Sequence, residues 1–165
     1  MDQAVVREQL VRLLDGSQAH ITLDRLLERF SEDRVNAVIA GVPYSPWRLL
    51  EHMRLAQRDI LDYMVADDYQ EREFPAGYWP PPGREADRRA WRDTVTGFRA
   101  DLNALRAIAR DTTRDLTAPL PRHADHTILR ELLIVGNHNS YHLGQLVVLE
   151  RALGPQPHQA PRSTA

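Results

Sequence analysis

Apolar residues recur along most of the chain with the period of an α-helix, and no segment shows convincing β-strand alternation. The clearest case is a run whose apolar residues are spaced by four, three, four and three positions: Trp91, Val95, Phe98, Leu102 and Leu105. This spacing is typical of helices that pack side by side in a bundle. The pattern therefore predicts an all-α protein in which each long helix buries one face.

The same period predicts four long helices, with approximate bounds 3–14, 46–64, 85–110 and 128–153, and a weaker helical stretch at 23–30. Ser45 is suited to cap the second long helix, with Pro46 at its first position. Thr127 is a plausible cap for the fourth, and Gly154 with Pro155 ends it. Four long helices with one long crossover between the second and the third predict a four-helix bundle.

The crossover, residues 67–84, contains the run FPAGYWPPPGR, in which proline and glycine exclude a regular element. Its length and aromatic content favour a packed segment over a floppy linker, and we expect a structural crossover that covers the core, with a functional loop as the alternative. We expect residues 1–154 to form a single domain and residues 155–165, PQPHQAPRSTA, to be a disordered tail.

The composition excludes several kinds of chemistry. The absence of cysteine excludes disulfides, thiolate ligands and a cysteine nucleophile. All 21 basic residues are arginine, so the chain has no lysine for a phosphate loop or a Schiff base. The net charge of −2 gives no reason to expect a nucleic-acid or membrane partner. No apolar stretch approaches the roughly 18 residues of a membrane span and no signal peptide is visible, so we expect a soluble cytoplasmic protein.

The run GNHNSYHLGQ, residues 136–145, places His138 and His142 four positions apart, on one face of the fourth long helix. His142 falls in the apolar stripe of that helix, which runs through Ile128, Leu132, Val135, Asn139, Leu146, Leu149 and Leu153. Burying imidazoles costs free energy unless they have partners. A metal ion is one solution and hydrogen bonds to amides or carboxylates are the other, and the spacing leaves both open.

His52, at the edge of the apolar face of the second long helix, is the candidate for a third ligand. One histidine on one helix and a pair on another predict a three-histidine metal site that leaves coordination positions open to water or substrate. His123 and His126 lie in a proline-flanked segment, where we expect a surface loop rather than an entrance to the site. The glycines on either side of the pair, Gly136 and Gly144, indicate either close helix contact or room beside a ligand.

Two segments, SPWRLLEHMRLAQRDIL and TILRELLIVGNHNSYHLGQLVVLERALG, together with YW and prolines before the third long helix, resemble the DinB/YfiT-like superfamily of bacterial metal-binding bundles. The resemblance runs from the first helix to Gly154. It implies that His52, His138 and His142 bind a divalent metal, zinc or nickel, and that the chain forms a homodimer. Some members of that superfamily are transferases or isomerases that use a thiol cofactor.

Three functions are compatible with these features. The first is a metal-dependent enzyme in which the ion activates a thiol or a water, either an S-transferase that uses a thiol cofactor or a hydrolase of a small-molecule substrate. Its catalytic acid and base are not identified, because Tyr141 points elsewhere and Glu51 lies about 100° around the helix from His52, where we expect it to be solvated or at most behind a ligand. The second is a non-catalytic dimeric bundle that binds a metal or a small molecule in a stress-related role. The third is a structural bundle with hydrogen-bonded core histidines.

Overall fold

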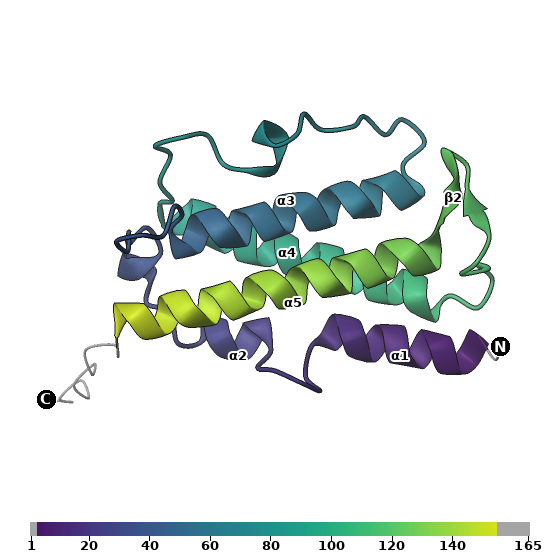
Figure 1. Ribbon diagram of the computed structural model, residues 1–165, viewed down its shortest axis with the longest axis horizontal. Helices are drawn as coiled ribbons and strands as arrows, with labels where there is room; N and C mark the ends of the chain where they lie inside the picture. The colour runs from purple at the N-terminus through teal and green to yellow at the C-terminus, as the bar shows by residue number, and fades with distance from the viewer. Residues whose placement is uncertain (1–2, 155–165) are drawn as a thin grey trace, which may run out of the picture.

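The computed structural model describes residues 3–154, which form a bundle of four long helices aligned along one axis (Figure 1). These helices are α1 (Gln3–Asp15), α3 (Pro46–Val65), α4 (Arg88–Arg110) and α5 (Ile128–Leu153). The short helix α2 (Leu23–Leu27) and the 3-10 turns η1 (Glu32–Arg34) and η2 (Ala76–Tyr78) lie in the connections. The predicted all-α class and four-helix bundle are confirmed. The tail predicted at 155–165 lies outside the described residues.

Side-chain caps set where the long helices begin. Ser45 accepts a hydrogen bond from the backbone N–H of Arg48 at 3.3 Å, with Pro46 as the first helical residue of α3. Thr127 caps α5 in the same way, as predicted. The start of α4 is three residues later than predicted, because Asp87 accepts a hydrogen bond from the backbone N–H of Ala90 at 2.7 Å and so occupies the cap position.

The core lies between two helix pairs, since α3 and α1 each contact both α4 and α5. Its most completely buried side chains come from all parts of the bundle and are mostly leucine: Leu26, Leu49, Leu50, Leu105 and Leu132. Within residues 3–154, no helix is long and apolar enough to cross a membrane. Because α1 and α3 pack against α4 and α5, the apolar stripes of these helices face one another, and polar residues on the stripes, such as His142, lie near the packing interface of α3 and α5.

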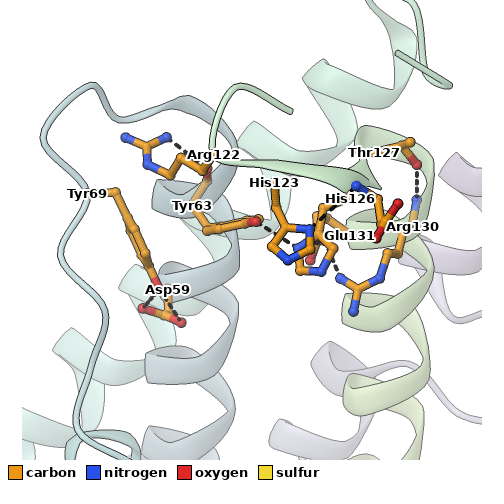
Figure 2. Close-up of polar contacts among 10 residues, drawn as sticks. Asp59, Tyr63, Tyr69, Arg122, His123, His126, Thr127, Arg130 and Glu131 are labelled. Carbon is orange, nitrogen blue, oxygen red and sulfur yellow. Dashed lines mark hydrogen bonds and ion pairs between the residues drawn. The ribbon is translucent and has the colours of Figure 1, made fainter. Parts of the chain in front are cut away.

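A short antiparallel hairpin, β1 (Pro119–Leu120) and β2 (His123–Thr127), precedes α5 at the end of the bundle where the N-terminus lies (Figure 1). The prediction of a plain surface loop here is wrong. Figure 2 shows the ring of His126 held against α3, where its Nδ1 lies 2.7 Å from the hydroxyl of Tyr63. The sequence HADHT gives no apolar alternation, so this strand has no signal of its own.

The crossover between α3 and α4 runs along the outer side of α3 over most of its length (Figure 1). Arg48 on α3 donates to the backbone carbonyls of Pro80 and Pro81, both at 2.8 Å. The ring of Trp79 stacks on that of Tyr44, with centroids 5.8 Å apart. The crossover is therefore packed on α3 rather than loose, and its residues lie within reach of side chains on the outer face of that helix.

Candidate metal centre

His52 on α3 and the pair His138 and His142 on α5 come together where these two helices pack, and all three residues are half-buried. The Nε2 atom of His52 lies 3.2 Å from Nε2 of His138 and 3.2 Å from Nε2 of His142. All three ligand atoms lie within 4.8 Å of one another, and no other such group of three is found among residues 3–154. The grouping predicted from the helical spacing is thus observed.

Two of the rings are held so that Nε2 carries a lone pair. The Nδ1 of His52 lies 2.8 Å from the backbone oxygen of Tyr78, and the Nδ1 of His142 lies 2.6 Å from the side-chain oxygen of Gln145. An amide oxygen only accepts, so each Nδ1 must be the donor, which leaves Nε2 of the neutral ring as an acceptor. Two acceptor nitrogens therefore face each other at 3.2 Å, and a hydrogen bond between them is excluded.

The third ring, His138, lies beside the side chain of Asn139. The Asn139 Nδ2 donates to Gln57 at 2.9 Å, and Gln57 in turn donates to the Phe98 carbonyl at 2.8 Å, so this chain of bonds fixes the orientation of the Asn139 amide. Its Oδ1 is buried and has no partner within hydrogen-bonding geometry. The Asn139 side chain raises the pKa of His138 and so partly offsets the lowering by burial, because an oxygen close to a ring N–H stabilises the protonated ring.

Burial keeps all three rings neutral. It lowers the pKa of His52 and of His142 and, together with repulsion from those two neighbours, lowers the pKa of His138 to about 4. Neutral imidazole is the form that binds a metal ion. Four-coordinate zinc with bonds of about 2.0–2.1 Å separates its ligand nitrogens by about 3.3 Å, close to the two 3.2 Å separations observed. The cluster can therefore hold a metal ion.

The crossover supplies one wall of this site. The Trp79 ring lies parallel to the His52 ring, with centroids 4.0 Å apart and 5° between the planes. The crossover thus gives His52 a hydrogen-bond acceptor, the carbonyl of Tyr78, and a stacking partner, the ring of Trp79. Neither role was predicted, since a backbone carbonyl has no sequence signature. Gln145, in contrast, has a signal, because a residue three positions after His142 lies over the same helix face.

A cavity of about 170 Å³ lies next to the cluster, between α1, α3, α4 and α5. Three of its lining residues, Met53, Asn139 and Leu143, each directly follow one of the three histidines in the sequence. His20 and Ser140 also line it and share a hydrogen bond of 3.0 Å. The cavity is thus bordered by apolar, amide, hydroxyl and imidazole groups and by charged side chains such as Asp24 and Arg106, and it has room for a small group or for ordered water.

Two residues next to the histidines in the sequence, Glu51 and Tyr141, are not part of the cluster. Glu51 is neither solvated nor behind a ligand: its half-buried carboxylate accepts from Arg54 at 2.6 and 2.8 Å and from Thr94 at 2.7 Å. Tyr141 is 64% exposed, but its ring lies against that of His142, with centroids 4.9 Å apart, so the prediction that it points elsewhere is confirmed only in part.

The two glycines differ in what surrounds them. A Cβ at Gly136 would lie 2.5 Å from Cγ of Leu13, whereas a Cβ at Gly144 would meet no atom within 4 Å. Close helix contact therefore accounts for the first glycine. Gly144 is exposed, so the space around it is open to solvent and supports neither alternative.

The comparison with known families agrees with this architecture. The profile described as the DinB superfamily matches residues 17–146, well over half of the chain, and includes all three histidines. The chain matches no curated protein and no solved structure at a significant level.

Proposed function

Because the chain belongs to the DinB superfamily, we propose that His52, His138 and His142 bind one divalent metal ion through their Nε2 atoms. The observation that carries the proposal is the pair of bare Nε2 atoms of His52 and His142, which face each other at 3.2 Å, an arrangement that a shared cation would stabilise. Imidazole ligands suit zinc and nickel, and we propose one of these as the ion.

We further propose that the protein is a metal-dependent enzyme acting on a small molecule, as an S-transferase with a thiol cofactor or as a hydrolase. Three protein ligands leave a coordination position for substrate, and the bound ion would supply an activated thiol or water near neutral pH. The chain itself orients the ligands: the Tyr78 carbonyl and Gln145 hold Nδ1–H of two rings. Trp79 covers one face of His52 and so shields that ring from water.

The alternative is a metal-binding bundle without catalysis, in a stress-related role, and one observation favours it. Among residues 3–154, no carboxylate joins the three histidines, so the cluster brings no acid or base of its own. Turnover separates the two functions. Metal-dependent conversion of thiol-acceptor or ester substrates by the loaded protein supports the enzyme, and its absence across such a panel supports the binding protein.

We also propose that the chain forms a homodimer through the outer face of α5. That face carries apolar side chains that the bundle leaves exposed: Leu133 (47%), Ile134 (36%), Tyr141 (64%) and Val148 (62%). Burying them against a second copy would remove apolar surface from water. Sedimentation of wild type and of Val148→Glu tests this, since the variant is expected to run as a monomer.

Metal content by elemental analysis, on untagged protein purified without added metal, tests the site itself. We expect about one ion per chain in the wild type and none in His138→Ala. His126→Ala is the matched control, because His126 lies outside the cluster, and it should keep the metal. A wild type that contains no metal and gains no stability from added zinc or nickel would contradict the proposal.

A further inference from the structure

A buried carboxylate on α3 collects three side chains of the crossover. Asp59 is only 8% exposed, and its oxygens accept from the hydroxyl of Tyr78 at 2.7 Å and from that of Tyr69 at 3.2 Å. The Arg72 guanidinium completes the set at 3.6 Å. Figure 2 shows Tyr69 reaching from the crossover onto Asp59. A buried carboxylate is costly unless it is hydrogen-bonded, so these contacts tie the crossover to α3.

Tyr78 connects this anchor to the histidine cluster. Its side-chain hydroxyl bonds to Asp59, and its backbone carbonyl accepts the hydrogen bond from Nδ1 of His52 at 2.8 Å. Asp59 follows His52 by seven residues, which is about two turns of α3, so both side chains project on the same side of the helix. The next residue, Trp79, stacks on the His52 ring. Tyr78 thus joins the buried carboxylate of Asp59 to the ring of His52, a proposed metal ligand.

We propose that Asp59 is a positioning residue for the metal centre: by holding the Tyr78 hydroxyl it places the Tyr78 carbonyl on His52 and directs Nε2 of His52 at the ion. The inference rests on the proposed metal site. Oxygen acceptors behind metal-bound histidines fix the ring and its tautomer, and their loss typically weakens metal affinity about 10–100-fold. Here the acceptor is a backbone carbonyl, so the sequence controls it indirectly, through side-chain contacts that hold this part of the crossover on α3, among them the bond of Tyr78 to Asp59.

The geometry offers a matched pair of variants. Tyr78→Phe and Tyr69→Phe each remove one hydroxyl from the same carboxylate, but only Tyr78 also bonds to His52. We expect Tyr78→Phe to bind zinc about 10-fold more weakly than wild type, and Tyr69→Phe to stay within about twofold. Zinc affinity is measured by competition with a chromophoric chelator. The visible spectrum of the cobalt-loaded protein reports ligand geometry independently of affinity.

A purely structural anchor predicts a different result, in which both variants lose similar stability in urea and bind zinc alike. Equal affinities for the two variants, or wild-type affinity and cobalt spectrum in Tyr78→Phe, would overturn the inference. If Tyr78→Phe does not fold, Asp59→Asn, which keeps the side-chain volume, takes its place against the same control. Failure of the wild type to bind either zinc or nickel would instead refute the metal site itself, so the two failures are distinguishable.

Discussion

The metal-free protein should lose stability as the pH falls below neutral, because the folded state holds His138 neutral. Burial and the neighbouring rings lower the pKa of His138 from 6.5 to about 4. Between those values the unfolded chain binds a proton that the folded chain does not, so protonation favours unfolding. The stability contributed by the neutral ring is complete above about pH 7, is lost as the pH falls toward 4, and changes no further below that.

The magnitude follows from the same shift. Between pH 7.5 and pH 5.0, linkage gives a loss of about 2 kcal/mol in the free energy of unfolding from His138 alone. The pKa values of His52 and His142 are lowered in the same direction, so they add to the loss. Saturating metal should oppose it, since the ion binds the neutral rings of the folded state.

Urea unfolding of chelator-treated protein at the two pH values measures this loss. In His138→Gln, the loss of stability between pH 7.5 and 5.0 should be smaller by about 2 kcal/mol, because the variant has no proton to gain at that position. His123→Gln, which removes a histidine from the exposed start of β2, is the matched control and should keep the wild-type dependence. The reasoning is refuted if His138→Gln loses as much stability between pH 7.5 and 5.0 as the wild type does.

Two further predictions concern residues of α5. Gly136→Ala should destabilise the protein by about 1–3 kcal/mol, because the added Cβ would overlap Leu13. Gly144→Ala should stabilise it by up to about 1 kcal/mol, because alanine favours the helix and its Cβ meets no other atom. Thermal unfolding of the two variants measures both changes. Gln145→Ala removes the acceptor of His142 Nδ1 and should weaken zinc binding about 10-fold with little change in helix content by circular dichroism, and an unchanged affinity would contradict the role of that bond.

The helices and the pairing of His138 with His142 could be predicted from the sequence because both depend on helical period alone. Residues four apart, such as His138 and His142, share a face wherever the helix lies. His52 joins them because its helix buries the adjacent face against α5. The hairpin could not be predicted in this way, since the residues of β2 are polar and its position depends on contacts such as that between His126 and Tyr63.

What the period does not determine is how each ring is turned, and a metal site depends on that. A helix fixes the Cα of His52, but the direction of Nε2 depends on what Nδ1 bonds to, and that partner is a carbonyl of the crossover. A carbonyl is common to every residue type, so its position is related to the sequence only indirectly, through side-chain contacts such as that of Tyr78 with Asp59 and that of Trp79 with His52. The proline-rich crossover and the buried carboxylate on α3 thus act together to orient the ring of His52. A change at either should alter metal affinity while the bundle stays folded, because neither Asp59 nor Tyr78 belongs to the two hydrophobic core clusters.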